Sequence, residues 1–154
     1  MSEITFAVEQ LNRIHKGPGW HGPSLSEALT GVSSESAARR PNLDTHSIFD
    51  LVHHIAAWDN VFGLRLKGEP TDEPSEGDFP VSTSNSQEQW SELIARLERA
   101  HDQLVEAVSS LKASNLEELV VGKECTKRFL IEGAILHHVY HTGQIVILKR
   151  ALNI

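Results

Sequence analysis

Two histidines, His137 and His141, lie four residues apart in an apolar segment near the end of the chain. In an α-helix, residues with this spacing lie one turn above each other and about 40° apart around the helix axis, so both imidazoles can reach one point. Imidazole is a common ligand of transition metals, and two histidines at this spacing on a helix can bind one ion. The pair therefore indicates two metal ligands, although two hydrogen-bonded core histidines would show the same spacing.

A third ligand must come from elsewhere in the chain, and His54 is the best candidate. In a helical arrangement, His54 lies at the edge of an apolar face beside Trp58, whereas His53 points toward solvent. Three inward histidines would leave positions open on the ion, as in catalytic metal sites. The alternative is a half-buried His54 that stacks on Trp58.

Other histidines and the single cysteine are given different roles. His138 is expected to support the fold or the metal ligands, and because it occupies the position of the glutamate in zinc peptidases, it argues against that class. Glu98 and His101 form half of a di-iron pattern, but no second Glu-x-x-His exists. Cys125 is expected to be inert or modestly reactive. No catalytic side chain is assigned.

Four further side chains could surround such a site. Tyr140 and Gln144 could orient ligands or substrate, or form a polar pair on the helix surface. Trp20 and His21, in a loop bounded by glycine and proline, could line the mouth of the site, or Trp20 could simply pack within its loop.

These residues are expected to be positioned by four long helices with apolar stripes. Ser24-x-x-Glu27 and Ser47-x-x-Asp50 are patterns typical of helix starts, and Gly17, Gly68 and Pro70 end helical patterns. The helices are predicted at about 4–16, 47–66, 90–111 and 128–152, with shorter ones at 24–31 and 116–120 and a surface connection at 69–86. The pattern predicts an all-α four-helix bundle and a single domain over residues 1–154.

Composition excludes several classes of function. The net charge is −7, and the 14 lysines and arginines are scattered, so no basic surface for nucleic acid is expected. No apolar run is long enough for a membrane span, and the start of the chain lacks a secretory signal pattern. With one cysteine there is no internal disulfide. A cytoplasmic protein without membrane or nucleic-acid partners is predicted.

At four points the sequence resembles the DinB/YfiT-like family of metalloenzymes, also called the DinB superfamily. The matching segments are Trp20–Ser24, His46–Ile48, His54–Trp58 and the motif His137-x-x-Tyr140-His141-x-Gly143-Gln144-Ile145. The resemblance implies an up-down-down-up four-helix bundle and frequent homodimers. It also implies a divalent metal, most often nickel or zinc, held by His54, His137 and His141; iron and manganese accept the same ligands.

Characterised members of the family include thiol-dependent enzymes, such as bacillithiol and mycothiol S-transferases and maleylpyruvate isomerase, and many other members are described only as metal-dependent hydrolases. We therefore expect a metal-dependent enzyme that acts on a small molecule and activates a thiol or water. Two alternatives stay open: a metal-dependent hydrolase, and a non-catalytic stress protein that binds a metal or ligand. A haem protein is disfavoured because two ligands on one helix cannot occupy opposite axial positions.

Overall fold

The computed structural model describes residues 1–80 and 86–154, and in these ranges it is all-helical with no strand. One isolated antiparallel bridge joins Leu119 to Thr126. The helices are α1 (Glu3–Lys16), α2 (Leu25–Leu29), α3 (Ser34–Ala38), α4 (Ile48–Leu66), α5 (Gln87–Ser109), the short 3-10 helix η1 (Ala113–Asn115) and α6 (Lys127–Leu152).

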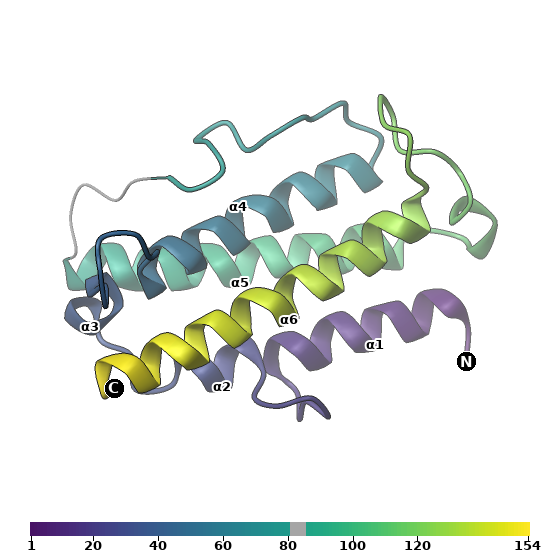
Figure 1. Cartoon of the computed structure of the whole chain (residues 1–154). Coiled ribbons are helices and arrows are strands. Elements are labelled where there is room, and N and C mark those ends of the chain that lie inside the picture. The colour runs from purple at the N-terminus through teal and green to yellow at the C-terminus, as the bar shows by residue number, and fades with distance from the viewer. Residues whose placement is uncertain (81–85) are drawn as a thin grey trace.

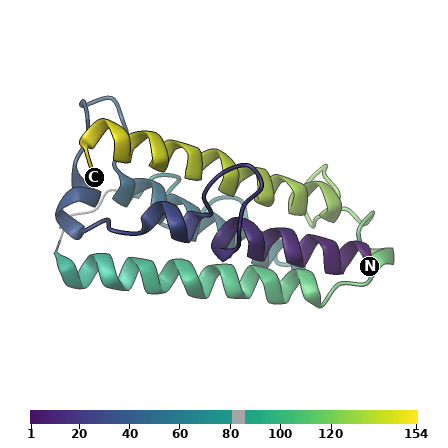
Figure 2. The ribbon, with the colours of Figure 1, turned by 90° about the horizontal axis from the view of Figure 1, so that it is seen from below.

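The four long helices lie side by side (Figure 1). Helix α4 packs against α5 and α6, and α1 packs against the same two helices from the other side. Helices α1 and α6 run in one direction, and α4 and α5 run in the opposite one. The view from below shows α2 continuing roughly the line of α1 along α6 (Figure 2).

The predicted start signals of α2 and α4 are confirmed. At α4, the Ser47 hydroxyl accepts a hydrogen bond from the Asp50 backbone N–H, while the Asp50 carboxylate accepts one from the Ser47 N–H at 2.8 Å. Arg40 forms an ion pair with the same carboxylate at 2.6 Å. Because these contacts satisfy the first backbone donors, they fix where α4 begins, less than two turns before His54.

The buried apolar residues form two clusters, one toward each end of the long helices. On α4 the first cluster ends at Ala56 and the second begins at Phe62. Helices α5 and α6 show the same gap, between Leu97 and Leu104 and between Ala134 and Ile145. The buried histidines and one buried aspartate lie in this middle layer or directly beside it: His15, His54, Asp59, His101, His138 and His141. Polar chemistry is therefore concentrated halfway along the bundle.

Three connections differ from the sequence prediction. Helix α3 was not predicted, and it starts with a reciprocal pair of hydrogen bonds between Ser33 and Ser36. The short helix expected at 116–120 is wrong, because that segment bends toward Thr126 and a 3-10 turn precedes it. The stretch 69–80 is more than a surface connection, since Arg65 anchors its start through the carbonyl of Thr71 at 2.8 Å. Residues 81–85 of the predicted connection lie outside the described residues.

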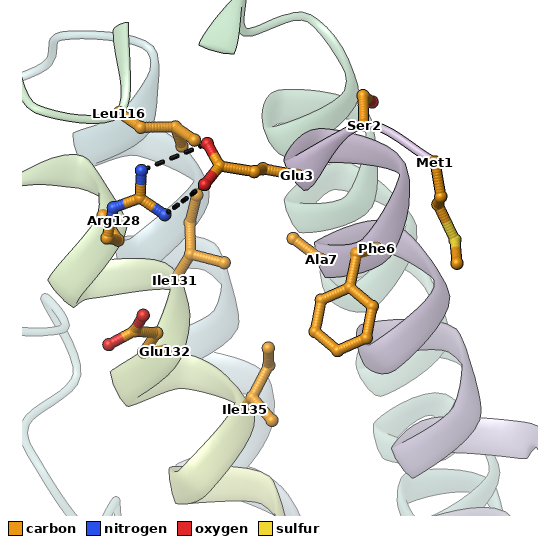
Figure 3. Close-up of a pocket in the computed structure, with 10 residues that line it drawn as sticks. All are labelled: Met1, Ser2, Glu3, Phe6, Ala7, Leu116, Arg128, Ile131, Glu132 and Ile135. Carbon is orange, nitrogen blue, oxygen red and sulfur yellow. Dashed lines mark hydrogen bonds and ion pairs between the residues drawn. The ribbon is translucent and has the colours of Figure 1, made fainter.

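A pocket of about 420 Å³ lies between α1 and α6 near the start of the chain (Figure 3). The Arg128 guanidinium bridges the two helices through the Glu3 carboxylate at 3.1 Å, and it also contacts Glu117 at 2.6 Å. Phe6 lies across the pocket from Ile135. No histidine lines this pocket, so it is separate from the candidate site described next.

Candidate metal centre

The three histidines singled out in the sequence come together between α4 and α6. His54 extends from α4, and His137 and His141 extend from α6. The Nε2 atoms of His54 and His137 lie 2.8 Å apart, and one nitrogen from each of the three rings lies within 4.8 Å of the others. Tertiary packing thus brings together residues 83 positions apart in the chain.

Two of the rings are oriented by hydrogen bonds from their other nitrogen. His54 Nδ1 donates to the Asp78 backbone carbonyl at 2.7 Å, and His141 Nδ1 donates to Gln144 Oε1 at 2.7 Å. Since each neutral ring carries one proton, both Nε2 atoms present a lone pair to the centre of the cluster. This arrangement is typical of metal-binding histidines, whose second nitrogen is held by an acceptor.

Burial keeps the three rings neutral. It lowers the pKa of His137 to about 2, with the nearby His141, His54 and His138 as further causes. Burial also lowers the pKa of His54 and of His141, although hydrogen bonds to Asp78 and to Gln144 act in the opposite direction. Neutral imidazole is the form that binds a metal, so protons compete weakly for these nitrogens.

The residues fit a divalent transition metal. Two nitrogens that bind one ion at about 2.1 Å with a tetrahedral angle between them lie about 3.4 Å apart. The Nε2 atoms of His54 and His137, at 2.8 Å, would therefore have to move apart only slightly to bind one ion. His137 Nδ1 is buried and has no hydrogen-bond partner among the described residues, which leaves Nε2 as its one engaged nitrogen. Three imidazoles without a protein carboxylate suit zinc, nickel, copper or iron more than magnesium or calcium.

Aromatic side chains and a loop enclose the cluster. Phe79 stacks on His54 with ring centroids 4.1 Å apart, and also on His46 at 3.7 Å. Phe62 meets His137 edge to face at 5.7 Å. The Trp58 indole donates a hydrogen bond to the Asp78 carboxylate at 2.7 Å, which ties the loop to α4. The connection 69–80 therefore forms one wall of the site, visible along α4 in Figure 1.

The sequence reasoning missed Asp78 and Phe79, because they belong to a segment without helical periodicity. Their proximity to His54 results from the path of the loop, which no spacing rule gives. The only available signal was an aspartate and an aromatic residue within a Pro- and Ser-rich stretch, and that signal is weak.

The remaining predicted neighbours have mixed outcomes. Gln144 does orient His141, whereas Tyr140 is exposed with its ring 5.0 Å from that of His141. Trp20 is 96% exposed, which contradicts the alternative that it packs within its loop. His21 is also exposed. Cys125 is half-buried against the second apolar cluster.

The histidines next to predicted ligands, His53 on α4 and His138 on α6, each have a partner that the sequence did not reveal, and for His53 the predicted orientation is wrong. His53 does not point into solvent, because its Nε2 lies 2.8 Å from the guanidinium of Arg96 on α5. His138 is more deeply buried than any of the three predicted ligands, at 0% exposed, and its Nε2 contacts both carboxylate oxygens of Asp59 at 2.8 and 2.9 Å. The expected supporting role of His138 thus has a named partner that the sequence did not reveal.

The fold and this cluster define an all-helical protein with buried histidines that could hold a metal ion. The chain belongs to the DinB superfamily, whose sequence model matches residues 19–145. This match confirms the resemblance seen in the sequence.

A conserved protein from Enterococcus faecalis, known from a crystal structure, has the same fold. Its TM-score is 0.74 at 17% sequence identity, with 99% of this chain and 98% of that chain covered. At this identity the likeness concerns the fold alone. No curated protein matches the chain.

Proposed function

We propose that the protein is a metal-dependent enzyme in which His54, His137 and His141 hold one divalent ion, with zinc or nickel as the first candidates. The observation that carries this proposal is the convergence of three neutral imidazoles, two of them held by acceptors on the far nitrogen. A cluster that served only packing would not need lone pairs directed at one point.

The reaction we propose is the transfer of a low-molecular-weight thiol to a small electrophile. When bound, the ion would act as a Lewis acid that lowers the pKa of a thiol or of water toward neutrality. The protein supplies orientation: Asp78 and Gln144 fix two rings. Phe79 and Phe62 make the surroundings apolar, which strengthens electrostatic interactions inside the site.

Metal content tests the first half of this proposal. Untagged protein is stripped with a chelator, reloaded with Zn²⁺ and freed of excess metal. The variant in which His54 and His141 are both replaced by alanine should then contain one zinc ion per chain less than the parent. His53→Ala is the matched control, since it changes the neighbouring residue on α4 and leaves the cluster intact. Equal zinc content in the double variant and the parent would overturn the site.

Turnover with and without added thiol tests the second half. A panel of electrophilic substrates is incubated with zinc- or nickel-loaded protein, and product is followed by mass spectrometry. Turnover that requires the thiol supports the transferase. Turnover in water alone would instead identify a hydrolase, and a zinc-dependent fold without any turnover would identify a binding protein.

We also propose that residues 1–154 form a single domain with the up-down-down-up four-helix arrangement of the family. The helix directions described above support it. No helix in the described ranges is long and apolar enough to cross a membrane. A cytoplasmic location is part of the proposal, and the one unpaired cysteine, Cys125, suits a reducing compartment.

A homodimer is the final part of this proposal, and the outer face of α6 is the surface we assign to it. Large apolar side chains are exposed there at positions spaced seven, four and seven residues apart: Phe129, Leu136, Tyr140 and Ile147. This spacing places them on one side of the helix, and an apolar stripe of that kind is typical of a helix that packs against another protein surface.

A further inference from the structure

A second cluster of buried donor groups lies in the middle layer, where all four long helices meet. Asp59 extends from α4, His101 from α5 and His138 from α6, and the ring of His15 from α1 stacks on that of His101 at 3.8 Å. None of these residues belongs to the three-histidine site. One donor atom each from Asp59, His101 and His138 lies within 4.8 Å of the others.

The side chains of this donor cluster are more deeply buried than those of the three-histidine site. Asp59 and His138 are 0% exposed and His101 is 2% exposed. Burying a carboxylate is unfavourable unless a cation or several donors compensate its charge. Among the residues that the structure describes, the Asp59 carboxylate has one hydrogen-bond partner, His138 Nε2.

The side chain of His101 lacks any partner that would explain its burial. Both of its ring nitrogens are buried without a hydrogen-bond partner among the described residues, and His15 Nδ1 and His138 Nδ1 are in the same condition. A phenylalanine would fill the same space without losing hydrogen bonds to water. Stacking on His15 does not account for a histidine either, because an apolar ring stacks as well. An ion or molecule bound to a ring nitrogen of His101 would account for a histidine at this position.

We propose that Asp59, His101 and His138 hold a second divalent transition-metal ion inside the bundle. Two imidazoles and one carboxylate form a donor set that zinc and ferrous iron accept. The ring centroids of His101 and His138 are 5.8 Å apart, close enough for both rings to bind one ion. The ion takes the place of the proton between His138 and Asp59, and this proton leaves to solvent.

The role of this second ion is structural. Its donors are enclosed by all four long helices, so no substrate reaches them. It would join α4, α5 and α6 at the level where both apolar clusters are interrupted. His137 and His138 are neighbours on α6, so the ion would also hold α6 in the rotation that presents His137 and His141 to the first site.

Zinc stoichiometry of site-selective variants tests this inference independently of the proposed function. His101→Phe keeps a ring of similar size to stack on His15 and removes only unpartnered nitrogens, so it should fold. Asp59→Asn keeps the side-chain shape and removes the charge. Circular dichroism and urea unfolding of the stripped proteins establish that each variant is folded, and His53→Ala is again the control.

We expect two zinc ions per chain in the parent and in His53→Ala, and one in His101→Phe and in Asp59→Asn. The double variant of His54 and His141 to alanine should also bind one. Loaded with Co²⁺, His101→Phe and that double variant should have different visible absorption spectra, since one retains three imidazoles and the other two imidazoles and a carboxylate.

A parent with one zinc that His101→Phe retains and the His54 and His141 double variant loses would overturn the second site and leave the proposed function intact. A parent with one zinc that His101→Phe loses and the double variant retains would support the second site and overturn the first. Absence of zinc from the parent would overturn both. If Asp59→Asn does not fold, the His101→Phe result alone decides.

Discussion

The Nε2 atoms of His54 and His137 lie 2.8 Å apart across the contact between α4 and α6. Nitrogens at that distance share a proton or a cation, since two lone pairs would repel each other. His54 presents a lone pair there, because its Nδ1 donates to the Asp78 carbonyl. The packing of α4 on α6 therefore depends on the proton or cation that lies between these two rings.

Zinc should stabilise the fold. A ligand that binds only the folded state at about 100 times its Kd adds about 2.7 kcal/mol per site to the free energy of unfolding. Urea unfolding of stripped and zinc-loaded protein measures this gain. The His54→Ala and His141→Ala double variant should show a smaller gain, and an unchanged gain would contradict the assignment of these ligands.

Gln144 should control metal affinity without binding the metal. Its Oε1 accepts from His141 Nδ1 at 2.7 Å and so fixes the ring. Loss of such an acceptor weakens metal binding by about 10- to 100-fold. Gln144→Leu should therefore weaken zinc binding in chelator competition by that factor, while Gln144→Glu, which keeps an acceptor of similar length, should retain parental affinity. Equal affinity in both variants would exclude the orienting role.

Stability of the stripped protein should fall in mild acid. Burial lowers the pKa of His101 from 6.5 to about 2, so the folded state keeps a neutral ring where the unfolded state takes up a proton. The unfolded state then binds more protons below pH 6.5, and stability is lost as the pH falls through that value. One such histidine contributes about 1.4 kcal/mol of loss per pH unit in this range.

Replacement of His101 by phenylalanine removes this contribution. Between pH 7.5 and pH 5.5, the free energy of unfolding of stripped His101→Phe should fall by about 1.4 kcal/mol less than that of the parent. Urea unfolding at the two pH values measures the difference. His21→Phe, at an exposed position, should follow the parent, and a His101→Phe slope equal to the parent slope would show that the ring is not held neutral by burial.

The exposed stripe of α6 should set the oligomeric state. Leu136→Glu places a charge in the middle of the stripe, so it should convert a dimer to a monomer. Light scattering coupled to size-exclusion chromatography measures the mass. Gln103→Glu, exposed on α5, is the control and should remain dimeric. A parent that is already monomeric would refute the dimer.

Local rules sufficed for the long helices and for the inward direction of the three histidines of the candidate metal centre. Helix capping by Ser24 and Ser47 involves contacts between residues three positions apart. The apolar stripes of the helices repeat every three or four residues, so both features are visible in the sequence. The convergence of His137 and His141 follows from the same helical geometry. Between the adjacent pair on α4, the angular count correctly separated His54, which reaches the cluster, from His53, which does not.

The tertiary structure decided what surrounds those residues. Because α6 packs against both α4 and α1, side chains about 100° apart on it are both buried, and His138 becomes a core residue paired with Asp59. The loop places Asp78 and Phe79 on His54 through contacts that no local period encodes. By itself the sequence determined which faces of the helices turn inward; which residues meet there depended on how four helices and a loop pack together.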